Sequence, residues 1–324
     1  MKTSQKVIVI GLDGASPEIF FDKWEDEFPH LKKIREKGLS GSLKSSIPPV
    51  TAPAWTSFAT GCNPGKHGIY DFLYKDEKTH EIRPVTSKNI KAPTVYEILK
   101  EYGMKSILIN LPLSYPPKTD NITITSLLTQ GDEFVFPREL KKEIPELDKY
   151  RIVPDPIFYV KFNKKKFIED ISDLEKTKFE IAKKLFAKDW NLFFILFGGT
   201  DWIQHKFYSD MVKNSKEKNQ IIIDFYKELD SYIGWFLENR DNNTTLFIMS
   251  DHGFNTYKGV IGLNNLLEKY GYLRFKKGKG KEVIPSRRLK EISKKQNNTK
   301  LLKINPLLAR LLTRSRFITD LLKK

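Results

Sequence analysis

Three continuous apolar runs stand out along the chain: Lys6–Leu12 (KVIVIGL), residues 190–197 (WNLFFILF) and Thr244–Met249 (TTLFIM). Runs of this kind, rich in β-branched and aromatic residues and without polar alternation, are typical of strands buried on both faces of a sheet. Weaker patterns predict strands at residues 39–47 and 105–110, an edge strand at 272–276, and a surface hairpin over 69–85.

Segments with helical spacing separate these strands. Helices are predicted at residues 29–38, 92–102, 163–188, 217–238 and 263–270. The long helix at 163–188 carries many lysines, and its charges are expected on a solvated face. Another helix should start at Pro53, which places Thr51 just before its first turn. Strands that alternate with helices predict an α/β fold, a three-layer α/β/α sandwich around a central, mostly parallel sheet.

Residues 1–275 are expected to form one catalytic domain. Within it, residues 112–156 show no clear element, and the length of this segment predicts a substrate-facing lid or subdomain. Residues 276–324 form a basic tail with an amphipathic helical pattern from Asn305 onward. One interpretation places this helix on an anionic membrane surface, as a peripheral membrane contact. The other packs its apolar side against the catalytic domain or against a C-terminal portion missing from this chain.

The net charge of +16 is located mainly in the tail. Residues 276–324 contain eleven lysines, five arginines and three acids, a charge of +13, which leaves +3 for residues 1–275. A nearly balanced body does not favour a nucleic-acid partner. The single cysteine, Cys62, excludes an internal disulfide, and no apolar run approaches the roughly 20 residues of a membrane span. These observations predict a soluble, cytoplasmic protein.

An acidic residue follows each of the three apolar runs: Asp13, Asp201 and Asp251. Ligand sites of open α/β sheets gather at the C-terminal ends of strands, so these acids predict a site. Asp201 and His205 are four residues apart and would share one face of a helix. Asp251 and His252 are adjacent in a turn, where their side chains could splay toward different metal ions.

With the Thr51 hydroxyl, these residues offer oxygen and imidazole ligands but no thiolate, a set that suits Zn²⁺ or Mn²⁺. Two divalent ions roughly 4 Å apart can stabilise both the attacking and the leaving oxygen of a displacement at phosphorus. Thr51 could then attack as an alkoxide. Taken alone, Thr51 is more simply interpreted as the N-cap of an ordinary helix.

Together, the motifs GLDG, TAPAWTS, TGCNPGKHGI, Asp201-x3-His205 and SDHG resemble the alkaline phosphatase superfamily, and within it the type I phosphodiesterase/nucleotide pyrophosphatase family, over residues 6 to about 275. The resemblance implies two zinc ions, a small-molecule phosphate-ester substrate and hydrolysis through a covalent phospho-enzyme on Thr51. It further implies that one metal ion, which activates Thr51, is held by Asp13, Asp251 and His252. Asp201 and His205 would hold the second ion.

The chain departs from the family pattern at two positions. The family completes its second metal site with a histidine downstream of Asp-His-Gly, but no histidine follows His252, and the others are His30, His67 and His80. His67 matches a structural position in the family. Ala54 stands where nucleotide pyrophosphatases usually carry an asparagine that donates to the phosphoryl oxygen. Losing one such donor costs on the order of 10²-fold in rate.

Three functions therefore stay open. The first is a metal-dependent hydrolase of phosphodiester or related bonds, with activity reduced by the absent histidine. The second is a catalytically weak or truncated relative that binds phosphorylated ligands or a partner. The third is a transferase that passes the phosphoryl group from Thr51 to an alcohol.

Overall fold

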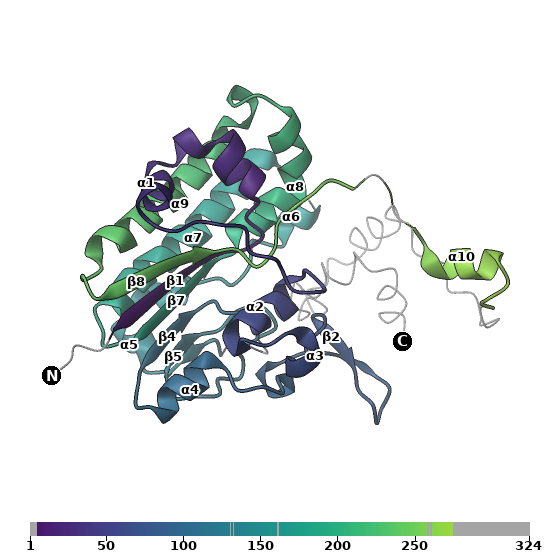
Figure 1. Cartoon of the computed structure of the whole chain (residues 1–324), viewed down its shortest axis with the longest axis horizontal. Helices are drawn as coiled ribbons and strands as arrows, with labels where there is room; N and C mark the ends of the chain where they lie inside the picture. The colour runs from purple at the N-terminus through teal and green to yellow at the C-terminus, as the bar shows by residue number, and fades with distance from the viewer. Residues whose placement is uncertain are drawn as a thin grey trace. The chain divides into compact units, whose positions relative to one another are not determined.

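The apolar runs form three adjacent strands of a six-stranded sheet in the computed structural model of the protein (Figure 1). The run at Thr244–Met249 is the edge strand and is only partly buried, so the prediction that it is buried on both faces is wrong. The model describes residues 5–129, 131, 133–160, 162–257, 259 and 261–274. Across the sheet the strands are β6 (Val135–Phe136), β5 (Ile122–Ile124), β4 (Ser106–Ile109), β7 (Leu192–Phe197), β1 (Lys6–Leu12) and β8 (Thr244–Met249). All neighbours run parallel except β5 and β6. The predicted mostly parallel sheet is therefore confirmed.

Helices cover both faces of this sheet, because the strand side chains alternate between two apolar cores. In β1, Ile8 and Ile10 pack into the larger core, whereas Val9 packs into the smaller one. The helices on the larger core are α1 (Pro29–Lys37), α7 (Lys164–Phe186), α8 (Gly199–Lys213) and α9 (Gln220–Asn239). The helices on the smaller core are α2 (Thr51–Thr60) and α4 (Val95–Glu101). Figure 1 shows the two sets on opposite sides of the strands, which confirms the three-layer sandwich.

Short elements complete the described chain. Strands β2 (Leu73–Lys75) and β3 (Ile82–Pro84) form the predicted hairpin. The short helices are η1 (Glu18–Lys23), η2 (Glu25–Glu27), α3 (Pro64–His67), η3 (Ser87–Asn89), α5 (Leu140–Glu143), η4 (Pro145–Lys149), α6 (Ile157–Val160) and η5 (Glu217–Asn219). Residues 112–156, the expected lid or subdomain, contribute β5 and β6 to the main sheet.

Two strand predictions are wrong. Residues 39–47 form no strand, and Leu39 and Leu43 are exposed to solvent, so their apolar pattern does not mark a buried face here. Residues 272–274 are not a strand either, and the rest of that predicted edge strand lies outside the described residues. The start of α2 also differs by two residues from the expectation. Thr51 is the first residue of the helix, and Pro53 is the third.

The chain divides into two compact units, residues 1–254 and 255–324. The described part of the second unit contains α10 (Leu263–Lys269). The amphipathic pattern from Asn305 onward lies outside the described residues, and its membrane or packing role stays a prediction. Among the described helices, none is both long enough and apolar enough to cross a bilayer.

The prediction that the charges of the lysine-rich helix are solvated is wrong for two side chains. Glu175 and Lys178 of α7 are completely buried. Their neighbours Glu180 and Lys183 are partly exposed, as expected. The predicted helix is confirmed. Its buried face is wider than its apolar residues alone indicate, because this face also includes Glu175 and Lys178.

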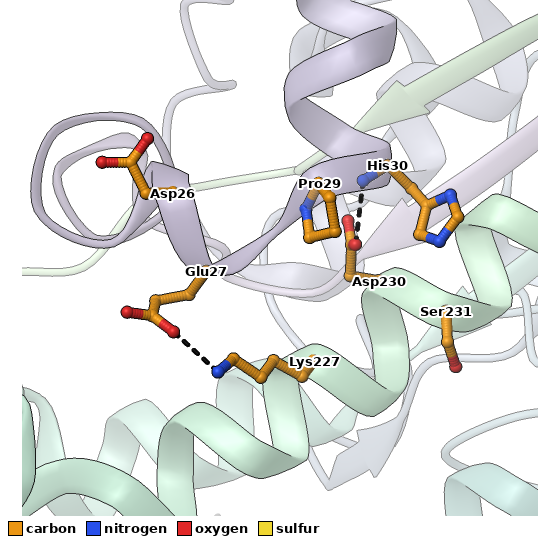
Figure 2. Close-up of a pocket in the computed structure, with 7 residues that line it drawn as sticks. All are labelled: Asp26, Glu27, Pro29, His30, Lys227, Asp230 and Ser231. Carbon is orange, nitrogen blue, oxygen red and sulfur yellow. Dashed lines mark hydrogen bonds and ion pairs between the residues drawn. The ribbon is translucent and has the colours of Figure 1, made fainter.

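A pocket of about 410 Å³ lies between η2, α1 and α9 (Figure 2). Asp230 on α9 accepts hydrogen bonds from the first amides of α1, those of His30 (3.0 Å) and Leu31 (2.8 Å). Lys227 pairs with Glu27 at 2.7 Å. The hydrogen bonds of Asp230 hold α9 to α1, and the Lys227–Glu27 pair holds α9 to η2. We therefore assign the pocket a structural role.

Gly234 on α9 allows the close contact between α1 and α9. A Cβ atom at this position would lie 2.4 Å from Nδ1 of His30, closer than atoms can pack. We expect Gly234→Ala to lower the free energy of unfolding by about 1–3 kcal/mol, measured by urea denaturation. Gly41→Ala is the matched control, since nothing lies within 4 Å of its added Cβ. Equal stability of Gly234→Ala and the wild type would contradict the prediction.

Candidate metal centre

The three acids after the apolar runs lie together because their strands are adjacent and parallel. Strand β1 lies between β7 and β8, so Asp13, Asp201 and Asp251 all follow strands that end at the same edge of the sheet. Hydrogen bonds link these strand ends directly: Asp13 N donates to the backbone carbonyl of Phe197 (3.1 Å), and Gly14 N donates to the side-chain Oδ1 of Asp251 (3.0 Å). All three carboxylates are largely buried.

Asp13, Asp251 and His252 form one cluster, with one ligand atom of each within 4.8 Å of the others. Nε2 of His252 lies 3.5 Å from Oδ2 of Asp251 and 3.8 Å from Oδ1 of Asp13. Nδ1 of His252 donates to the carbonyl of Gly253 (2.9 Å), so its proton is fixed there and Nε2 presents a lone pair. Asp251 and His252 thus face the same cluster, contrary to the expectation that they splay apart.

Asp201 and His205 form a second pair on the first turns of α8, with Nε2 of His205 3.1 Å from Oδ1 of Asp201. This pair adjoins the first cluster. A Cβ atom added to Gly14, whose φ is +63°, would lie 3.2 Å from Oδ1 of Asp201 and 3.1 Å from Cε1 of His252. A larger residue here would be strained by the positive φ and would press on both groups, so glycine suits this position.

Two polar side chains of α8 hold this helix against the loop after β1. Thr200 Oγ1 donates to Asp13 O (2.5 Å), and Gln204 Nε2 donates to Gly14 O (2.6 Å). A third contact comes from the segment expected as a strand, where Ser45 Oγ donates to Asp251 O (2.6 Å). These three positioning residues were not predicted from the sequence. Thr200 and Gln204 flank Asp201 in the sequence, but Ser45 carries no signal.

Thr51 lies beside the first cluster. Its Oγ1 is 3.4 Å from Oδ1 of Asp13 and 3.4 Å from Nε2 of His252. No side chain caps the start of α2. The first amide groups of the helix are therefore left for an anionic ligand. Ala54, also in the first turn, is buried and offers no side-chain donor.

Buried His67 braces α2 from the loop that follows it. Nδ1 of His67 accepts from Ile69 N (3.1 Å), so Nε2 carries the proton and donates to Ser57 Oγ (3.0 Å). Ser57 Oγ in turn donates to Pro53 O (2.8 Å) in the first turn of α2. His67 thus supports the helix that carries Thr51, while His30 packs against α9 and His80 is exposed in the hairpin.

Burial lowers the pKa of His67. A depressed pKa in the folded state means that the unfolded chain binds a proton first as the pH falls. We therefore expect stability to decline as the pH drops below about 6.5, the ordinary pKa of histidine. His67→Gln retains a donor for Ser57 but does not titrate, so its free energy of unfolding should vary less between pH 7 and 5. Urea titrations at several pH values test this, and parallel curves for both proteins would contradict it.

The electrostatics of the centre favour a bound cation. Burial and the nearby carboxylates of Asp251 and Asp201 raise the pKa of Asp13 well above its usual range. Burial also raises the pKa of Asp251. Oδ2 of Asp251 is buried and receives no hydrogen bond from the described part of the chain. Carboxylate oxygens crowded in this way, beside the Nε2 lone pair of His252, fit divalent metal ions.

Comparisons with solved structures place the fold. Phosphonoacetate hydrolase from Sinorhizobium meliloti 1021, in complex with phosphonoformate, matches with a TM-score of 0.59 and 21% identity, over 83% of this chain and 62% of that chain. Murine ectonucleotide pyrophosphatase/phosphodiesterase 5 matches with a TM-score of 0.49 and 18% identity, over 77% of this chain and 57% of that one. This chain thus spans less than two thirds of either structure.

No curated protein sequence matches the chain significantly. A family model, however, described as type I phosphodiesterase / nucleotide pyrophosphatase, matches residues 7–317, nearly the whole chain. The match agrees with the resemblance found in the sequence motifs and with the alkaline phosphatase-like arrangement of the sheet. The chain therefore belongs to the type I phosphodiesterase / nucleotide pyrophosphatase family.

Proposed function

We propose that this protein hydrolyses phosphodiester or related phosphate-ester bonds of a small molecule, using two divalent metal ions and a covalent phospho-threonine at Thr51. The observation that carries the proposal is the position of Thr51 Oγ1, 3.4 Å from both Asp13 and His252, at the uncapped start of α2. Zn²⁺ suits the ligand set best, and Mn²⁺ is the alternative.

Each half of the centre has a role in this proposal. Asp13, Asp251 and His252 would hold one ion, and Asp201 and His205 would hold the other. When bound, the ions supply Lewis-acid stabilisation of the charge on the phosphoryl group and favour the ionised form of Thr51. The first amides of α2 would donate to the phosphoryl oxygens, in partial replacement of the side-chain donor that Ala54 lacks.

The reaction has two displacements. Thr51 Oγ1 loses its proton and bonds to phosphorus while the bond between phosphorus and the leaving-group oxygen breaks, and that oxygen takes up a proton. A water molecule then attacks the phosphorus of the phospho-threonine. The bond to Thr51 breaks, the hydroxyl is regained with a proton, and the second product leaves as a phosphate monoester.

A transferase is the second candidate, and the histidine content favours it. Within residues 1–324 no histidine follows His252, so this stretch offers the Asp201–His205 half no downstream histidine of the kind that the family pattern implies. Poorer activation of water would lengthen the life of the phospho-threonine, and an alcohol could then accept the phosphoryl group. A binding protein without turnover is the extreme case of the same deficiency.

One assay separates these functions. The zinc-loaded protein is incubated with bis-p-nitrophenyl phosphate, and p-nitrophenol is followed with and without a chelator. Steady turnover that stops on chelation and returns with zinc supports the hydrolase. A burst of one equivalent, with the phosphoryl adduct found on Thr51 and turnover restored by an added alcohol, supports the transferase. No release and no adduct overturn both and leave the binding function.

A further inference from the structure

The pair Glu175 and Lys178 on α7 lies completely out of contact with water, with Nζ of Lys178 2.6 Å from Oε2 of Glu175. Removing two charges from water costs about as much as their attraction returns, so apolar residues of similar size generally stabilise a core equally well. Stability of the fold is therefore a weak explanation for a buried pair at this place. Its other contacts give a stronger one.

Both members of the pair bind the backbone where β7 turns into α8. Lys178 Nζ donates to Leu196 O (2.9 Å), near the end of the strand. Glu175 Oε1 accepts from Gly199 N (2.7 Å), the first residue of the helix. The positive end of the α8 dipole also stabilises a carboxylate at this point. The pair thus fixes both sides of a single turn.

The hydrogen bonds of Thr200 and Gln204 tie α8 to the loop after β1, and the Glu175–Lys178 pair adds support at two backbone atoms that those contacts do not reach. The pairing of β4 with β7 ends at Ile109 and Ile195, so Leu196 O lies beyond the last ladder contact on that side. Asn110 Nδ2 is its second donor, at 3.1 Å. No side chain from the helix itself caps α8. A Cβ atom on Gly199 would lie 2.7 Å from Cγ2 of Ile171 on α7, which shows how closely the turn packs there.

Asp201 follows Gly199 by two residues, and His205 lies one helical turn further along. A displacement of the turn would therefore move both side chains relative to Asp13 on the neighbouring strand. We propose that Glu175 and Lys178 are positioning residues, which hold the Asp201–His205 half of the centre in register with the Asp13–Asp251–His252 half. The inference rests on the proposed function, because it concerns the second metal ion.

The test removes both charges together, so that neither is left buried without its partner. Glu175→Met/Lys178→Met keeps the length of both side chains but none of their strong hydrogen bonds. Glu175→Gln/Lys178→Met keeps the acceptor for Gly199 N and serves as the conservative variant. The matched control is Glu180→Met/Lys183→Met, which removes a pair of the same spacing from the partly exposed side of α7.

Two readouts distinguish positioning from packing. In the metal-free proteins, amide hydrogen exchange at residues 199–201 should be at least about tenfold faster in the Met/Met variant, with β1 unchanged, because the turn loses a charge-assisted hydrogen bond. In zinc titrations, one equivalent should bind with wild-type affinity and the second about 10–100-fold more weakly. The Gln/Met variant should recover part of both effects, and the control pair should show neither.

Wild-type exchange at residues 199–201, or an unchanged second zinc affinity, in the Met/Met variant would overturn the proposal. If that variant does not fold, the Gln/Met variant decides by the same criteria, with smaller changes expected. If the wild-type protein binds no zinc, the proposed function fails instead. The exchange data would still report whether the pair holds the turn.

Discussion

Thr51→Ala is expected to lower the rate of phosphodiester turnover by at least about 10³-fold, because the variant lacks the oxygen that forms the covalent intermediate. Substrate binding should change far less, since the carboxylate and imidazole ligands and the amides of α2 are retained. The measurement is kcat with bis-p-nitrophenyl phosphate, together with mass spectrometry for the adduct on residue 51. We expect no adduct in the variant.

Two further variants control this experiment. Thr51→Ser keeps the hydroxyl and should retain both adduct and measurable turnover. Thr60→Ala lies at the other end of the same helix, where its hydroxyl donates to Thr56 O and accepts from Cys62 N, and it should have near wild-type activity. Substantial turnover by Thr51→Ala would show that water attacks the substrate directly and that Thr51 is not the nucleophile.

Asp13→Asn is expected to change stability in opposite directions with and without metal. In the metal-free protein, Asp13 is buried beside Asp251 and Asp201, which raise its pKa, so a neutral side chain should increase the free energy of unfolding at pH 7. The variant should also lose most of the stabilisation by zinc, since an asparagine is a poor ligand. We expect its zinc affinity to fall by at least about 10²-fold. Thermal unfolding with and without zinc measures both effects.

Asp230→Asn is the matched control for Asp13→Asn. Asp230 is also a buried aspartate with a raised pKa, but it accepts hydrogen bonds from the amides of α1 and lies in the pocket between α1 and α9. Its substitution should leave stabilisation by zinc unchanged. An Asp13→Asn protein that keeps the full zinc-induced rise in melting temperature would exclude Asp13 as a ligand.

The sequence predicted the parts of the fold that depend on long local patterns. The strands β1, β7 and β8 come from continuous apolar runs, and each is followed by an acid, so their common edge could be inferred, whereas their order and register could not. The helix start predicted beside Thr51, together with the motif resemblance, added Thr51 to the predicted site. In the structure, Thr51, Asp13, Asp251 and His252 lie within hydrogen-bonding or near-contact distances, with Asp201 and His205 adjacent.

The wrong and the missed predictions concern segments whose structure depends on tertiary contacts more than on the local sequence. Residues 39–47 have a strand-like composition but find no partner among the described strands. The short strands β5 and β6 lie in a Pro- and Thr-rich segment, and the pairing of β5 with β4 and of β6 with β5, not local propensity, makes them extended. The burial of Glu175 and Lys178 could not be predicted either. Helical periodicity does not show whether a charged side chain has an ion-pair partner and a backbone hydrogen bond in the protein interior.

Strand β8 is the last strand of the sheet, paired on one side to β1, and Phe247 in its middle is about half exposed. Edge strands fray more readily than central ones. Because Asp251 and His252 follow this strand directly, an ion shared with Asp13 would cross-link the edge strand β8 to the neighbouring strand β1. Release of that ion would then require β8 to separate from β1, so metal exchange and local unfolding of β8 should proceed at one common rate.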